Sequence, residues 1–225
     1  MKISIENEVL QWCPALTVSG IVVRGINLQA LGGDGATDWP VPDALRAERV
    51  IKDWKALHKS VSTEKKARSS IEYLVKAASK GSLRSIGPLV DLYNHASLMT
   101  LAPFGGEDIA CLEGGLTLAR AQGHEAFVPL GKTEIQTPGS GEVLWLDGRG
   151  RVVCRALNWL ESDLHKITEA SRDVVFVSER PGAEFPDPAD GLAWLAEKLA
   201  PCSRQIECFV LDTSRPVLHL EHADA

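Results

Sequence analysis

The sequence has 225 residues, of which 44% are hydrophobic and 24% charged, and its formal net charge is −6. These values are typical of a globular protein with a substantial core, and they argue against a disordered or fibrous chain. No apolar run approaches the roughly 20 residues needed to cross a bilayer, and the first residues lack the apolar core of a signal peptide. We therefore expect a cytoplasmic protein without a membrane partner.

The cysteines predict neither disulfides nor a metal site. There are five of them, an odd number without a C-x-x-C pair, whereas a disulfide framework or a structural zinc site would use paired spacings. The nearest pair, Cys202 and Cys208, has no neighbouring histidine to complete a ligand set. We therefore expect no metal and no cofactor.

The first part of the chain has strand patterns separated by a short helical turn. Residues 2–6 and 16–26 read as strands, and residues 8–13 between them read as a helical turn that Pro14 ends. Three glycines and two prolines predict a loop over 31–42.

Two helices are predicted next, from 43 to about 60 and from 62 to about 79, because Asp43 and Ser62 are suitable N-cap residues. Residues 49–84 hold ten Lys and Arg against three acids, a local net charge of +7, which leaves −13 for the remainder. This asymmetry is typical of a phosphate-binding face on an acidic body, although a solvated helical surface has the same composition.

A third helix is predicted between the prolines at 88 and 103. Its apolar positions recur at the helical period, and Asp91, Asn94 and Ser97 share one polar stripe. The helix runs into residues 104–108, where two glycines precede two carboxylates. The pattern predicts a pocket wall, although an ordinary amphipathic helix with a solvated face has the same spacing.

The second half of the chain is rich in strand patterns. Strands are predicted at 116–121, 126–130, 142–146, 152–155 and 174–178, with a hairpin turn at 147–150. A final helix at 189–199 and a last strand at 206–211 follow. Together these elements predict an α/β (α+β-like) protein, a single domain over 1–225 with a mixed sheet covered by helices.

Four short stretches resemble, in the same order, the tRNA-binding and editing domain of the phenylalanyl-tRNA synthetase beta chain. They are residues 89–108, 112–115, 141–147 and 167–174, and the resemblance is clearest over about 84–178. It is strongest to free-standing proteins that consist of that domain alone. The resemblance implies the same fold, tRNA binding and hydrolysis of the ester of a mischarged aminoacyl-tRNA. A module that binds amino acids or other small molecules without catalysis is the alternative.

The resemblance places a pocket around Asn94, the bend at 103–108 and the turn at Leu157 and Asn158. The chain departs from the family pattern because Tyr93 replaces a threonine, Gly105 replaces a histidine, and bulky residues fill the small-residue turn. A smaller pocket follows, which would fit a small aliphatic or polar amino acid better than tyrosine.

Candidate roles follow from the resemblance for three sets of residues. The groups expected to position water or take its proton are Asn94, Glu107, Asp108 and His165. The residues expected to contact the substrate are Tyr93, Ser97, Phe104, Gly105, Gly106, Arg155, Leu157 and Asn158. The residues expected to bind RNA are Lys55, Lys59, Lys65, Lys66, Arg68, Lys76, Lys80 and Arg84.

Simpler roles remain open for two of these residues, since Asp108 is suited to cap a helix and Arg155 to pair with an acid. The expected partner is tRNA or the aminoacyl-tRNA 3′ end, or a free amino acid in the alternative, and not DNA.

Overall fold

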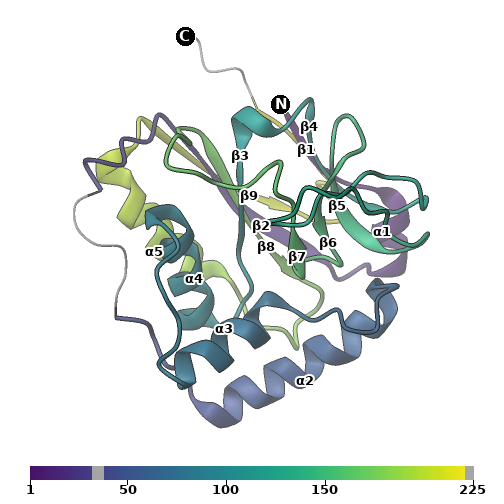
Figure 1. Cartoon of the computed structure of the whole chain (residues 1–225), viewed down its shortest axis with the longest axis horizontal. Helices are drawn as coiled ribbons and strands as arrows, with labels where there is room; N and C mark the ends of the chain where they lie inside the picture. Colours follow the sequence, from purple (N-terminus) through teal and green to yellow (C-terminus); the bar gives the residue numbers. More distant parts are fainter. Residues whose placement is uncertain (32–37, 221–225) are drawn as a thin grey trace.

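Two β-sheets form the centre of the molecule, and helices cover the outer side of one sheet and one end of the pair (Figure 1). The computed structural model describes residues 1–31 and 38–220. The first sheet has six strands in the order β10-β1-β4-β5-β6-β7, of which only β1 and β4 are parallel neighbours. Its strands are β1 (Lys2–Ile5), β4 (Gly115–Arg120), β5 (Val143–Asp147), β6 (Val152–Arg155), β7 (Leu160–Glu161) and β10 (Val217–His219).

The second sheet is antiparallel throughout and has the order β3-β8-β2-β9. Its strands are β2 (Thr17–Arg24), β3 (Gly105–Asp108), β8 (Val174–Arg180) and β9 (Gln205–Leu211). The α/β class with helical cover is confirmed, but the strands predicted as one mixed sheet divide into two sheets, of which only the first is mixed.

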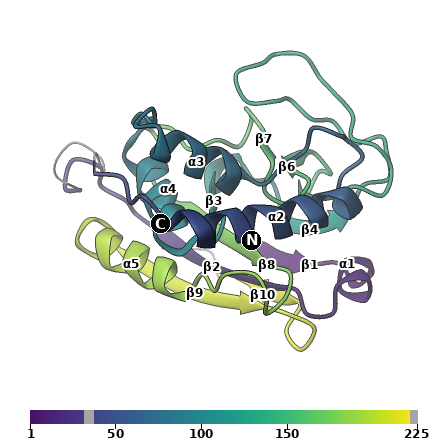
Figure 2. The same ribbon diagram turned by 90° about the horizontal axis from the view of Figure 1, so that it is seen from below.

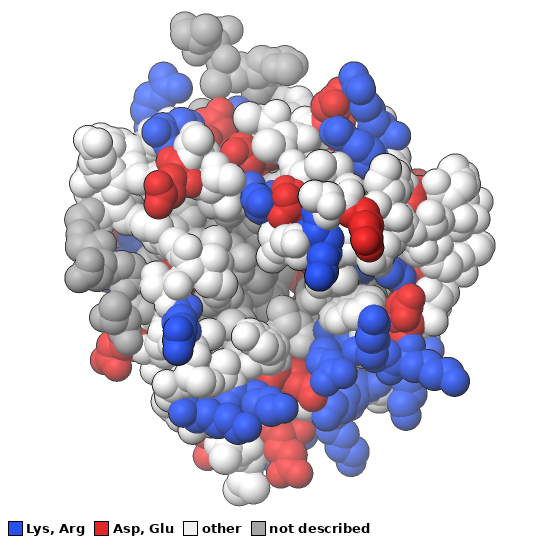
Figure 3. All heavy atoms as spheres, in the orientation of Figure 1, with Lys and Arg blue, Asp and Glu red and all other residues white. Residues whose placement is uncertain are grey.

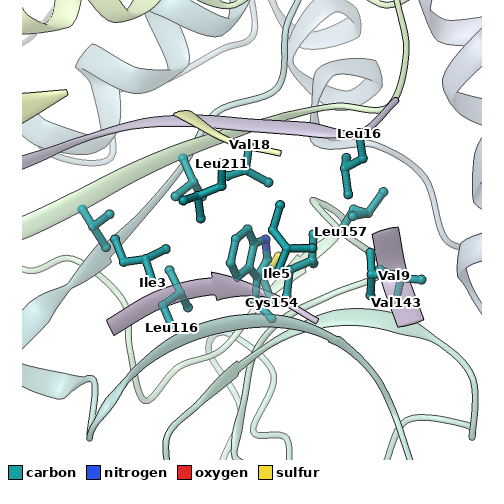
Figure 4. Packing of buried hydrophobic residues seen from close by; sticks show 14 of the residues in the cluster. Ile3, Ile5, Val9, Leu16, Val18, Leu116, Val143, Cys154, Leu157 and Leu211 are labelled. Atoms are coloured by element: carbon teal, nitrogen blue, oxygen red, sulfur yellow. The ribbon is translucent and has the colours of Figure 1, made fainter. Parts of the chain in front are cut away.

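The main hydrophobic core lies between the two sheets (Figure 4). Val18 and Val22 of β2 belong to this core, whereas Ile21 and Val23 belong to a second core on the other face. This division follows from the alternation of side chains along a strand. Because β2 is apolar on both faces, both faces must be covered, and the two cores cover them. Strand β2 also has a neighbouring strand on each side.

Helices α4 (Pro88–Thr100) and α5 (Ala189–Leu199) cover the outer face of the second sheet, where they contribute Leu89, Leu92 and Leu195 to the second core. The other helices are α1 (Asn7–Trp12), α2 (Ala44–Val61) and α3 (Ser70–Ser79), with short 3-10 turns at Ile109–Cys111 and Ala200–Cys202. Figures 1 and 2 show α2 running along one end of the two sheets. No helix in the described ranges is both long and apolar enough to cross a membrane.

The N-cap predicted at Asp43 and the helix start predicted at Pro88 are confirmed. The side chain of Asp43 accepts a hydrogen bond of 2.8 Å from the backbone N–H of Arg46, and Pro88 is the first residue of α4. The prediction of a helix starting after Ser62 is wrong, because α3 begins only at Ser70 and Ser62 follows α2 as its C-cap.

Three further expectations are corrected. Residues 126–130 form isolated bridges at Phe127 and Pro129 instead of a strand. The expected bend at 103–108 is mostly strand, because β3 pairs with β8. Strand β10 follows the strand predicted to be last. Residues 32–37 of the loop predicted over 31–42 lie outside the described residues.

Candidate functional site

Glutamates from three strands lie between the sheets, next to the edge strands β3 and β7. Glu107 and Glu161 are in contact, and Glu179 is close enough for its charge to raise the pKa of both. Glu107 on β3 is paired with Val175 of β8, so it lies on the same face of the second sheet as Glu179. Glu161 of β7 is paired with Cys154 of β6 in the first sheet. The side chains of Glu107 and Glu161 are in hydrogen-bonding contact, which brings the two sheet edges together.

Burial raises the pKa of all three carboxyl groups. The proximity of Glu161 raises the pKa of Glu107 further, and the pKa of Glu161 itself is raised by burial to about 7. Two carboxylates in contact repel each other strongly when both are ionised, so the pair holds a shared proton near neutral pH. Glu107 and Glu179 are only 2% and 3% exposed, whereas the Glu161 residue as a whole is half-buried.

Glu179 is held in place on both carboxylate oxygens. Trp145 Nε1 donates a hydrogen bond of 2.6 Å to Oε1, and Asn158 Nδ2 donates one of 3.2 Å to Oε2. Glu107 Oε2, in contrast, is buried without a hydrogen-bond partner in the part of the chain that the structure describes. The cluster therefore has one fixed carboxyl group and one with free bonding capacity.

Tyr93 of α4 lies beside the glutamates. Its ring centroid is 6.0 Å from that of Phe176, and burial together with the charges of Glu161 and Glu107 raises its pKa. The hydroxyl group therefore keeps its proton, and it is a hydrogen-bond donor near the shared proton of the carboxyl pair.

A strained turn positions Asn158. Ala156 and Leu157 both adopt the left-handed region, with φ values of 47° and 64°, a conformation that costs non-glycine residues about 1 kcal/mol or more each. The turn is stabilised because Leu157 is buried in the main core and its N–H donates to the carbonyl oxygen of Val143 at 3.0 Å. Leu157 thus supports the site from the core instead of lining it.

Several predicted site residues have structural contacts instead. The His165 ring has no exposed surface and its Nε2 lies 3.4 Å from Asp147 Oδ2, while burial lowers its pKa. Asp108 accepts hydrogen bonds from Ala110 N at 2.9 Å and Ser171 Oγ at 2.6 Å, so the capping role is confirmed. The structure therefore does not bring the His165 and Asp108 side chains into the carboxylate cluster.

The residues of the polar stripe on α4 have different neighbours. Ser97 donates to the carbonyl oxygen of Tyr93 and accepts from Phe104 N at 3.0 Å, which fixes the chain between α4 and β3. Asp91 accepts from Ser85 Oγ and from Ile86 N. Asn94 is buried, and its side chain makes no hydrogen bond to the described part of the chain.

The residues around the predicted bend are mainly packing positions. Phe104 belongs to the second core, and a Cβ atom at Gly106 would lie 2.8 Å from Phe176 Cδ1. Gly105 differs, because the nearest atom to a Cβ atom built there is Val177 Cγ2 at 4.0 Å. Space is therefore open beside Glu107 on β3.

Arg155 is paired with an acid, as the simpler alternative predicted, but the pair is buried. Its Nε and Nη2 donate to Glu142 Oε1 and Oε2 at 2.8 and 2.9 Å. Glu142 also accepts from Thr63 Oγ1 at 2.9 Å and from Thr63 N at 3.2 Å. The ion pair consequently connects the loop at 62–69 to the first sheet, and it occupies Nε and Nη2 of Arg155.

The loop at 62–69 and the end of α2 enclose a hollow of about 620 Å³, here called the basic hollow. Five predicted RNA-binding residues line it: Lys55, Lys59, Lys65, Lys66 and Arg68. Figure 3 shows basic side chains gathered over this end of α2. Lys76, Lys80 and Arg84 do not line the hollow. Lys76 lies in the last turn of α3, and the other two follow that helix.

Sequence reasoning found Glu107 but missed Glu161 and Glu179. The two-residue strand β7 is too short for a periodic pattern, and Glu179 follows an apolar run without any local sign of its partners. The described residues contain no group of three or more His, Cys, Asp or Glu side chains arranged to hold a metal ion.

Comparison with known families matches residues 54–182 to the B3/4 domain. Because this match covers more than half of the sequence, the chain belongs to the B3/4 domain family. The resemblance to the domain of the phenylalanyl-tRNA synthetase beta chain is thereby confirmed, over a range that begins well before residue 84.

Among solved structures, the chain is similar to an N-terminal fragment of the phenylalanyl-tRNA synthetase beta-subunit from Pyrococcus horikoshii. The TM-score is 0.47 and the sequence identity 14%, and the match covers 91% of this chain. It covers 49% of the fragment, so the chain spans about half the length of that structure. No match is found among curated proteins.

Proposed function

We propose that this protein binds the aminoacyl 3′ end of tRNA and hydrolyses its ester bond, releasing the amino acid. The observation on which this proposal depends is the half-buried Glu161, whose pKa is raised to about 7 by burial next to Glu107. A group with a pKa near the working pH is suited to general acid–base catalysis. Membership of the B3/4 domain family supports a role connected with tRNA.

The proposed reaction needs one water molecule and one group to move a proton. Ionised Glu161 takes a proton from the water molecule as the water oxygen attacks the ester carbonyl carbon. The bond between that carbon and the ribose oxygen then breaks, and Glu161 returns the proton to the ribose oxygen. Protonated Glu107 and the Tyr93 hydroxyl are the nearby donors for the developing negative charge. The products are a free amino acid and a tRNA with an intact 3′ hydroxyl group.

The family histidine is not required in this scheme. Glu161 performs the proton transfer that a residue at position 105 would otherwise assist. Asn158 keeps Glu179 fixed through its hydrogen bond of 3.2 Å. The charge of Glu179 in turn helps to raise the pKa of Glu107 and Glu161. We retain Asn94 as a proposed substrate contact, because its side chain makes no hydrogen bond within the described residues. The bulk of Tyr93 favours a small aliphatic or polar aminoacyl group.

Deacylation of a panel of mischarged aminoacyl-tRNAs tests the proposal. We expect the wild-type protein to cleave at least one member, and Glu161→Gln to reduce the rate about 100-fold or more, since general base catalysis contributes about that much. Glu169→Gln is the matched control, because Glu169 is exposed and away from the cluster. Absence of cleavage across the panel, or equal rates for both variants, would contradict the proposed hydrolysis.

Binding of a free amino acid is the second candidate function. The unpartnered Glu107 Oε2 favours it, because a carboxyl oxygen without a partner can accept a hydrogen bond from an ammonium group. A ligand that binds only the native state raises the melting temperature. An amino acid that stabilises the protein, in the absence of any deacylation, would favour this candidate over the hydrolase.

A further inference from the structure

The basic hollow has an uneven balance of charge. It is lined by five Lys and Arg side chains and by two acids, Glu64 and Glu72. Lys55 is paired with Glu72 at 3.1 Å. Lys59, Lys65 and Lys66, however, have no ion pair within the described ranges of the chain. Exposed cations that converge on one concave surface attract an anion strongly.

The floor of the hollow contains a buried histidine with unused bonding capacity. His58 lines the hollow and is 4% exposed. Its ring lies beside the Asn158 side chain, but neither ring nitrogen is within hydrogen-bond geometry of a described residue, and both nitrogens are shielded from solvent. Burial lowers its pKa to about 4, against the opposing influence of Asn158, Glu72 and Glu142. The ring is thus neutral at neutral pH and carries one N–H group.

From these two observations we propose that the basic hollow binds a terminal phosphate group, with Lys59, Lys65 and Lys66 as the neutralising cations and with His58 as a directional donor once its ring turns toward the hollow. A terminal phosphate carries a charge of about −1.5 to −2 and three acceptor oxygens. A phosphodiester carries a single negative charge, and its chain continues on both sides, so it fits an enclosed floor less well.

The neighbourhood of His58 favours the 5′ end of an RNA as the source of this phosphate. Asn158 lies beside His58 and donates to Glu179, so only two residues separate the basic hollow from the carboxylate cluster. In an acceptor stem the 5′ end and the 3′ end belong to neighbouring strands. The choice of RNA as the source of the phosphate rests on the proposed function. The phosphate site itself does not depend on that function, since a free nucleotide has the same terminal group.

The first experiment measures phosphate binding alone, by isothermal titration calorimetry and thermal shift. We expect inorganic phosphate and AMP to bind and adenosine not to bind. The double variant Lys65→Gln/Lys66→Gln should lose about tenfold or more in AMP affinity, and Lys132→Gln, which changes an exposed lysine elsewhere, should not. His58→Gln should reduce the preference for AMP over adenosine while the circular dichroism spectrum stays that of the wild type.

The second experiment compares a tRNA carrying its 5′ phosphate with the same tRNA after dephosphorylation. Tighter binding of the phosphorylated tRNA, about tenfold, identifies RNA as the source. Equal binding of the two tRNAs together with AMP binding identifies a free nucleotide. If AMP and adenosine behave alike and the two tRNAs bind equally, the phosphate site is refuted. Loss of deacylation with retained AMP binding would refute only the proposed function, so the two failures are distinguishable.

Discussion

Glu161 connects the proposed chemistry with the stability of the fold. Burial raises its pKa from an ordinary value of 4.5 to about 7. Between these two pH values the folded protein holds a proton that the unfolded chain has released. The free energy of unfolding should therefore fall as the pH rises through this window, because the folded state binds more protons than the unfolded state.

Replacing Glu161 by Gln should remove its part of this pH dependence. We expect the free energy of unfolding of Glu161→Gln to change less between pH 5 and pH 7.5 than that of the wild type. Urea unfolding monitored by circular dichroism at several pH values measures the difference. The opposite influence of His58, whose pKa is lowered, is present in both proteins and cancels in the comparison. Identical slopes for the two proteins would contradict the raised pKa.

The two glycines of β3 provide a matched pair. Gly106→Ala should destabilise the protein by about 1–3 kcal/mol, because the new Cβ atom would meet Phe176 and Ile167 at 2.8 and 2.9 Å. Gly105→Ala should change the free energy of unfolding by less than about 1 kcal/mol, since its nearest neighbour is 4.0 Å away. Chemical denaturation compares the two variants, and equal losses would show that the packing around β3 differs from that described.

At the scale of single residues, the sequence indicates which positions are polar better than it indicates their hydrogen-bond partners. The spacing of Asp91, Asn94 and Ser97 correctly indicates a shared stripe, but their hydrogen bonds depend on segments that approach only in the folded chain. Ser97, for example, accepts a hydrogen bond from the backbone of Phe104 just before β3, and nothing in the helical period indicates that contact. The same limit explains why His165, which bonds to Asp147, was expected at the site.

At the scale of elements, the loop at 62–69 depends on one buried carboxylate. Glu142 joins Arg155 to Ser62 and Thr63, so the hydroxyl groups that would suit a helix cap are used for a contact with a strand far along the chain. This is why the helix predicted from Ser62 starts only at Ser70. Elements with local signals, such as the Asp43 cap and the helix at 189–199, were predicted correctly.

Removal of the Glu142 carboxylate should therefore be costly. We expect Glu142→Ala to lower the free energy of unfolding by about 3–5 kcal/mol, because it leaves the buried Arg155 with only Glu64, at 3.9 Å, as an acidic partner. Glu64→Ala is the control, since Glu64 lies 3.9 Å from the same arginine but is 44% exposed, and its loss should cost about 1 kcal/mol or less. Hydrogen exchange of residues 62–69 should accelerate in Glu142→Ala alone. Similar losses in both variants would contradict the anchoring role.

At the scale of the whole molecule, an acidic body carries a local basic face. If the five cations of the basic hollow contact RNA phosphates, the logarithm of the binding constant should fall against the logarithm of salt concentration with a slope of about −4. Each neutralising substitution, such as Lys59→Gln, should reduce that slope by about 1. Filter binding at several salt concentrations measures it. A slope near zero would remove the RNA contact from this face.

The arrangement of the second sheet has a consequence for synthesis on the ribosome. Strand β2 lies between β8 and β9, which come roughly 150 residues or more after it in the chain. At about 5–20 residues per second, its apolar residues wait roughly ten to thirty seconds for their neighbours to emerge. A nascent chain thus exposes the apolar residues of β2 until β8 and β9 have been made, and products truncated before these strands should aggregate or bind chaperones.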